Sequence, residues 1–194
     1  MIKNILRKMF INELLTSSKE NILNKITTII FFNIILILFS QIKLYLPFLP
    51  VPFTLQTFAI LLISAILGYK YGTLVVVLYI IEGALGLPVF ANFSNLSNVI
   101  GGYTLGYIIG FIPATFIFGI LLNFLKKQNK INFLNLILVS FISISFIFFF
   151  GILWITYLTN NINLALAYGL YPFIITEPIK IIIASFVISK LYSK

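Results

Sequence analysis

The 194-residue sequence contains no cysteine and no histidine, and only 9% of its residues are charged. Without cysteine, the chain has no disulfide, thiol nucleophile or thiolate metal ligand. Without histidine, it lacks the side chain that most readily acts as a base near neutral pH, and also the commonest zinc ligand. The sequence shows neither a nucleophile–base set nor paired carboxylates at catalytic spacing, so we expect a protein that is not an enzyme.

Apolar residues dominate what is present. They make up 61% of the sequence, and the mean hydropathy is +1.13. This is far more apolar side chain than one soluble core could bury. A spanning helix needs roughly 20 mostly apolar residues, so the length accommodates about six spans. The composition therefore predicts an all-α polytopic membrane protein with six transmembrane helices.

Six apolar runs mark the predicted spans. They cover residues 26–42, 53–67, 71–87, 103–124, 134–158 and 171–191, and proline, glycine, asparagine and lysine separate them. The chain is thus predicted to consist of a membrane domain, residues 26–194, preceded by a cytoplasmic segment, residues 1–25. That segment mixes five basic residues with apolar ones. It is expected to be either an amphipathic stretch on the inner leaflet or a disordered tail.

The basic residues fall on alternate connections. Eleven lie in the amino-terminal segment, the second and fourth loops and the carboxyl end, whereas the first loop has only Lys43 and the third and fifth have none. By the positive-inside rule, this bias predicts that both termini are cytoplasmic and that the third loop is outside. The net charge of +9 does not indicate nucleic-acid binding, because the aromatic residues lie in apolar runs and form no basic stacking groove.

Three ionisable residues, Glu82, Glu177 and Lys180, lie within predicted spans. Each costs about 2.5 to 3.5 kcal/mol on insertion, so such residues usually face protein or water and often mark a site. Glu177 and Lys180 are neighbours on one helix face in the outer half of the last span. They either neutralise each other for insertion, or face an outward cavity where Lys180 pairs with a substrate carboxylate and Glu177 accepts from substrate N–H groups.

Glu82 is harder to assign. It lies about 9 Å below the outer end of the third span. A hydrogen bond to another helix and a place in the wall of the same cavity are equally consistent with this position.

Several uncharged polar residues border the predicted outer side. Thr54 is expected to cap the second span, whereas Gln56 places a polar group inside an apolar run and is the better candidate for a site. Asn92, Asn95 and Tyr103 flank the third loop. They are either ordinary loop and interfacial residues or partners of a neutral ligand with amide-like groups.

Glycine spacing and the single tryptophan give two further expectations. Gly102, Gly106 and Gly110 line one face of the fourth span, which lets a second helix approach closely. Gly102 is nearer the loop and could instead leave room for a ligand. Trp154 is expected near the outer end of the fifth span, as an interfacial anchor or a stacking partner.

Three separated blocks carry a resemblance to a known family. They are VPFTLQT at residues 51–57, GLPVF followed by GGYTLGY within residues 86–107, and PFIITEPIK at residues 172–180. In this order they resemble the BioY family, the biotin-capturing subunits of energy-coupling-factor (ECF) transporters. The resemblance implies capture of biotin from outside, without a cofactor, by a six-helix protein in the bacterial inner membrane.

The resemblance also implies partners and site residues. A second membrane subunit and two ATPases would supply the energy and bind ATP, since this chain has no GxxxxGK[ST] loop. Glu177 stands where the family usually has Asp, and Lys180 would be the cation for the valerate carboxylate. The predicted substrate-binding residues are Gln56, Glu82, Asn92, Tyr103, Glu177 and Lys180.

Two other functions stay open at this point. The same scaffold could serve another vitamin or small solute. Alternatively, the ionisable groups could only hold helices together in a membrane interaction subunit that binds no small molecule. A homo-oligomer is also left open.

Overall fold

The computed structural model describes residues 22–44 and 50–192, so most of the predicted amino-terminal segment lies outside the described residues. Its helices are α2 (Ile22–Gln41), α3 (Gln56–Ala84), α4 (Leu96–Ile100), α5 (Leu105–Lys127), α6 (Phe133–Thr159), α7 (Ile162–Gly169) and α8 (Phe173–Tyr192), with a short 3-10 helix, η2 (Ala91–Phe93). The prediction of an all-α protein is confirmed.

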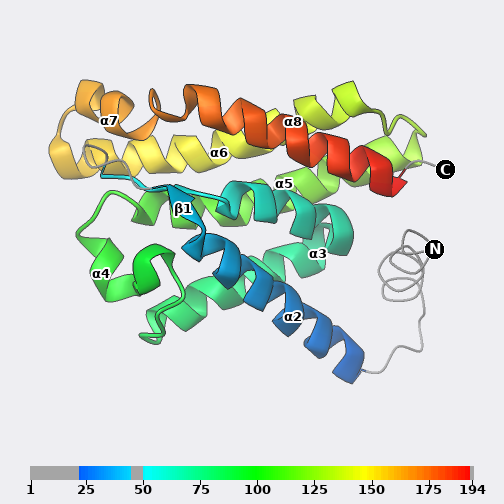
Figure 1. Ribbon diagram of the computed structural model, residues 1–194, viewed down its shortest axis with the longest axis horizontal. Coiled ribbons are helices and arrows are strands. Elements are labelled where there is room, and N and C mark those ends of the chain that lie inside the picture. The colour runs from blue at the N-terminus through cyan, green and yellow to red at the C-terminus, as the bar shows by residue number, and fades with distance from the viewer. Residues whose placement is uncertain (1–21, 45–49, 193–194) are drawn as a thin grey trace.

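The long helices form one bundle. In Figure 1, α5 lies between α3 and α6, α8 packs against α6, and α2 lies against α3. Among the described residues, four helices are long and apolar enough to cross a membrane, namely α2, α3, α5 and α6. The pair α7 and α8, bent by 47° at its break, makes a fifth candidate. The structure is therefore a helical membrane protein with four or five candidate spans.

Helix α3 is folded back on itself at Gly68. The φ angle of this residue is 72°, a left-handed conformation that glycine adopts without strain. The Gln56 side-chain amide donates to the Tyr79 hydroxyl over 2.7 Å, although a straight helix would separate the two residues by about 35 Å. The arms, residues 56–67 and 69–84, therefore run antiparallel, and the reversal coincides with the glycine-containing break predicted between the second and third runs.

The connection before α3 differs from the prediction. The second apolar run was expected to be helical from Phe53, but β1 (Lys43–Leu44) and β2 (Phe53–Thr54) pair as antiparallel strands instead. The prolines at positions 50 and 52 disfavour helix in the residues before them. The N-cap position of α3 is Leu55 and not Thr54, but Thr54 Oγ1 accepts from Gln56 N, the first backbone N–H of the helix, over 3.4 Å. The Thr54 hydroxyl also donates to Gln56 Oε1 over 3.0 Å.

Two glycines of α5 allow the close helix packing that their spacing predicted. A Cβ atom at Gly110 would lie 2.8 Å from Ile147 Cα of α6, and one at Gly106 would overlap the backbone oxygen of Phe150. Both glycines are buried, and the backbones of α5 and α6 meet along this face. This interface fixes the position of the first turns of α5 relative to the loop that precedes them.

Replacing Gly110 by Leu should destabilise the bundle, because the side chain has no space against α6. We expect a loss of at least about 1 to 3 kcal/mol, seen as a lower thermal unfolding midpoint of the detergent-purified protein. Gly101→Leu is the control, since an added Cβ there meets nothing within 4 Å. Equal midpoints for the two variants would contradict this account of the interface.

Candidate ligand-binding site

A cavity of about 260 Å³ lies where the β1–β2 hairpin, the loop from η2 to α4, and the first turns of α5 and α8 meet. Its size is at the lower end of small-molecule pockets, which run from roughly 300 Å³ upwards. Five of the six predicted site residues line it: Gln56, Asn92, Tyr103, Glu177 and Lys180. Segments far apart in the sequence thus converge on one cavity.

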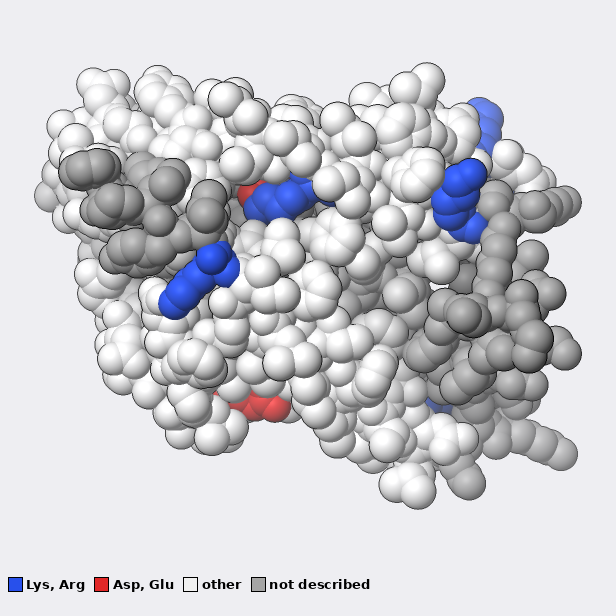
Figure 2. Space-filling view, viewed as in Figure 1, with Lys and Arg blue, Asp and Glu red and all other residues white. Residues whose placement is uncertain are grey.

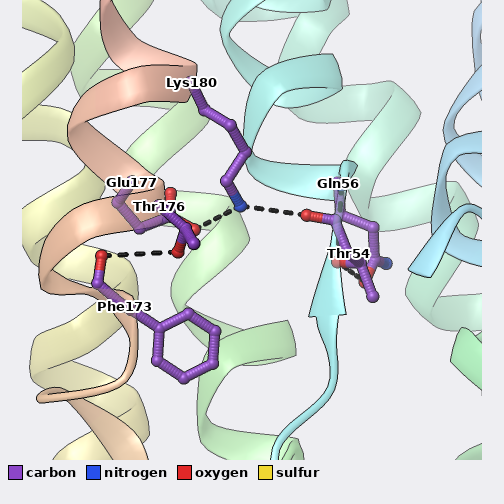
Figure 3. Close-up of polar contacts among 6 residues, drawn as sticks. All are labelled: Thr54, Gln56, Phe173, Thr176, Glu177 and Lys180. Carbon is purple, nitrogen blue, oxygen red and sulfur yellow. Dashed lines mark hydrogen bonds and ion pairs between the residues drawn. The ribbon is translucent and has the colours of Figure 1, made fainter. Parts of the chain in front are cut away.

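The ionisable residues of α8 form its charged wall (Figure 3). Lys180 Nζ contacts Glu177 Oε1 and donates to the Thr54 carbonyl over 2.9 Å, and the Lys180 and Glu177 side chains are only 13% and 7% exposed. Both interpretations of this pair are therefore met in part, because the two side chains neutralise each other and also face a cavity. Glu177 Oε2 is buried and has no hydrogen-bond partner in the described part of the chain. A buried oxygen without a partner favours the binding of a ligand that supplies a hydrogen-bond donor.

Gln56 lies beside this pair, held in one orientation. Its Nε2 donates to the Tyr79 hydroxyl, and its Oε1 accepts from the Thr54 hydroxyl. A primary amide has two N–H donors and two acceptor lone pairs, so one donor and one lone pair are left for a ligand. Close by, Thr57 Oγ1 is buried on the cavity wall without a partner among the described residues.

The loop that carries Asn92 is held by Gln41, a residue that the sequence did not single out. Asn92 lies in η2 with a φ of 65°, and its Oδ1 accepts from Lys43 Nζ. At the end of α2, Gln41 Oε1 accepts from Phe93 N over 3.1 Å, while its Nε2 donates to Phe90 O over 2.9 Å. The end of α2 thereby fixes the backbone on either side of Asn92. Nothing in the local pattern around Gln41 predicted this role.

Aromatic rings form an apolar part of the cavity wall. The Phe148 and Phe173 ring centroids are 5.5 Å apart, and Tyr107 packs edge-on against Phe148 at 5.8 Å. The Tyr107 hydroxyl donates to Gly169 O over 2.7 Å, which ties α7 to α5. The four-residue spacing of Tyr103 and Tyr107 could have indicated that both reach one face. Phe148 lies within a run of phenylalanines that gives no such signal.

The sixth predicted residue, Glu82, does not line the cavity. On the second arm of α3, Tyr79 and Gly83 are buried, whereas Glu82 lies beside them and is half-buried. Its Oε2 is shielded and lacks a partner within the described ranges. The helical period explains the result, since the face that carries Tyr79 and Gly83 turns inward and Glu82 falls on its flank.

The structure also places three other residues that the sequence singled out. Trp154 Nε1 donates to Gly102 O over 2.8 Å, so this side chain tethers α6 to the start of α5. Gly102 itself lines the cavity, as one of its two interpretations required. Asn95 has the loop role, since its side chain caps α4 and donates to Gly86 O over 3.1 Å.

Comparison with known proteins decides the family. The sequence model of the BioY family matches residues 11–194. The chain belongs to the BioY family. It is 36% identical to the biotin transporter BioY of Thermotoga maritima over 146 residues, covering 75% of this chain and 83% of that relative. It is also 39% identical to the probable biotin transporter BioY of Pyrococcus horikoshii over 131 residues, covering 68% and 74% of the two chains.

The fold agrees with this assignment. A crystal structure of the S component for biotin from an ECF-type ABC transporter superposes with a TM-score of 0.80 at 26% identity, covering 92% of this chain and 96% of that one. BioY proteins are transporter components, so the expectation that the chain is not an enzyme is confirmed. Together with the apolar helices, family membership makes it a multi-pass bacterial membrane protein.

Tyr79→Phe should destabilise this BioY protein, because it leaves the buried Gln56 amide without its acceptor. The expected loss is about 1 to 3 kcal/mol, measured as a drop in the thermal unfolding midpoint. Tyr157→Phe is the matched control, since the Tyr157 side chain is 74% exposed. A midpoint for Tyr79→Phe that equals the control would show that the bond between the two arms of α3 contributes nothing.

Proposed function

We propose that this chain captures biotin on the outer side of the membrane as the S component of an ECF-type transporter. The relatives named as biotin transporters and the solved S component for biotin support the substrate. The single observation that carries the proposal is the Glu177–Lys180 pair in the cavity, where a buried carboxylate oxygen without a partner lies beside an ammonium group.

The proposed topology has six spans with both termini in the cytoplasm. Counting the arms of α3 separately and α7 with α8 as one gives six crossings. The arms are about 18 Å and 24 Å long, shorter than the hydrocarbon core, and local thinning of the bilayer accommodates such spans. In Figure 2 most of the face is uncharged, and basic atoms lie at the right-hand end, where α8 finishes in Figure 1, as well as near the centre and on the left. The right-hand end is the cytoplasmic one in this topology, so the cavity opens outside.

The charged pair matches the edge of a urea. A cyclic urea presents an N–H donor next to a carbonyl acceptor, and Glu177 and Lys180 present an acceptor next to a donor. The aromatic wall formed by Phe148, Phe173 and Tyr107 then receives the apolar thioether ring. The valerate carboxylate extends to the mouth, where Lys43 contacts Asn92. This differs from the sequence-based hypothesis, which paired Lys180 with the carboxylate, because Lys180 and Glu177 touch and so address the same end of the ligand.

Energy comes from partners in this proposal. A membrane coupling subunit and two ATPases would drive release of biotin to the cytoplasm, and this chain would bind biotin without a cofactor. High-affinity binding should therefore be measurable on the purified chain alone.

Isothermal titration with biotin tests the role of the two intramembrane carboxylates. Glu177→Gln should weaken biotin binding about 10- to 100-fold, the loss expected for a hydrogen bond to a charged group. Glu82→Gln is the matched control and should bind like the parent, because Glu82 does not line the cavity. Riboflavin and thiamine should give no heat of binding. An unchanged Glu177→Gln dissociation constant, or a parent that binds no biotin, would refute the proposal.

Biotinamide, which lacks the negative charge, tests the orientation of the ligand. Lys180→Met should weaken biotin and biotinamide to a similar extent, about tenfold or more, because Lys180 donates to the urea carbonyl. If the variant loses affinity for biotin but keeps the parental affinity for biotinamide, Lys180 binds the carboxylate and the urea assignment fails.

A further inference from the structure

A second cavity, of about 290 Å³, lies at the opposite end of the bundle. The turn of the α3 hairpin, the last turns of α5 and the end of α8 enclose it. Lys70, Lys126 and Asn123 contribute polar groups, and none of the described residues that line it is a carboxylate. We propose that this cavity binds the phosphate of an anionic phospholipid headgroup from the cytoplasmic leaflet. The choice of leaflet rests on the topology proposed above.

Backbone packing sets the positions of the two lysines. A Cβ atom at Gly119 of α5 would lie 2.5 Å from Tyr69 N and 2.6 Å from Tyr69 Cα, so the turn of α3 is pressed directly against α5. Lys70 follows Tyr69 in sequence. Asn123 and Lys126 lie one and two turns beyond Gly119 on the same helix face. The basic groups therefore reach one cavity from two elements whose separation cannot vary.

The two ammonium groups keep their capacity for an anion. Lys70 Nζ lies 5.9 Å from the Tyr69 ring centroid and Lys126 Nζ lies 5.7 Å from that of Tyr192. Such contacts are worth about 0.5 to 1 kcal/mol at exposed sites and use none of the N–H donors. Tyr192 is fixed in turn, because its hydroxyl donates to Ala65 O over 2.8 Å.

Neither described carboxylate can neutralise these lysines. Glu177 is paired with Lys180 in the first cavity. Glu82 is twelve residues beyond Lys70 on the same arm, about 18 Å along the helix axis. Within the residues that the structure covers, the second cavity is therefore a concave site of positive charge.

The surroundings favour a lipid as the source of the phosphate. Leu67 and Leu122 form apolar walls beside the basic groups, as a headgroup with an attached glycerol backbone requires. The cavity lies at the helix ends, at the level of the headgroups in the proposed topology. An anionic leaflet attracts each nearby lysine by about 1 kcal/mol. The cavity brings two lysines together, so they would also hold the phosphate in a defined position.

Thermal unfolding in a neutral detergent, with added lipid, tests the proposal on the full chain. Phosphatidylglycerol should raise the unfolding midpoint by several degrees more than phosphatidylcholine does, and the double variant Lys70→Gln/Lys126→Gln should lose most of that difference. Lys127→Gln is the matched control, because it also lies in the last turn of α5 but does not line the cavity. It should keep the parental difference. Lys126→Gln alone, with a partial loss, serves if the double variant does not fold.

Three results would overturn the inference. An equal loss in Lys127→Gln would mean that lipid responds only to diffuse surface charge. No difference between the two lipids in the parent would mean that there is no anion site. Stabilisation by inorganic phosphate to the same extent as by phosphatidylglycerol would assign the cavity to a soluble anion. Biotin titration of the double variant should match the parent, so failure at this cavity is distinguishable from failure of the biotin site.

Discussion

The contact between Lys180 and Glu177 is the constraint on which the rest of the structure depends. A charge within the hydrocarbon region is costly, and both groups belong to a helix that lies inside an apolar bundle. The Lys180 ammonium has two partners, the Glu177 carboxylate and the Thr54 carbonyl. Of the atoms of this pair, Glu177 Oε2 remains without a partner in the described chain. A cavity at this point gives that oxygen access to a ligand donor.

The geometry around that contact comes from chain reversals. The β1–β2 hairpin delivers the Thr54 carbonyl, and the reversal at Gly68 brings Tyr79 to the Gln56 side chain. Close packing of α5 on α6 at Gly110 then sets the depth of the aromatic wall. Each of these features is set by the course of the backbone. The positions of the polar side chains in the site therefore follow from where the chain reverses and where helices pack closely.

Much of this was predictable from the sequence. Hydropathy indicated the long helices because transfer of apolar side chains dominates their energetics, and the expense of buried charge singled out Glu177 and Lys180. Glycine spacing predicted that another helix packs closely on this face of α5, because only a missing side chain permits it. Each of these predictions concerns one helix, and the residues of that helix alone provide the evidence for it.

Features that depend on pairing between distant segments were not predictable. The short strands at Phe53 and Thr54 were read as helix, because two residues of strand pairing leave no periodicity. The Gln41 side chain binds a loop about fifty residues away in the sequence. Phe148 lines the cavity, but nothing in the local sequence distinguishes it from the neighbouring phenylalanines. The prediction placed Glu82 in the cavity from its depth within the third span alone. The rotation of the helix about its axis decides which way the side chain points.

The three-residue separation of Glu177 and Lys180 also bears on how the chain enters the bilayer. The last helix carries its counter-ion with it, so the pair can form within that segment before any other helix is met. The remaining contact, to Thr54, comes from a segment made much earlier in synthesis. The last helix can thus leave the translocon with Glu177 and Lys180 already neutralising each other, and the cavity closes only when this helix docks on helices already in place.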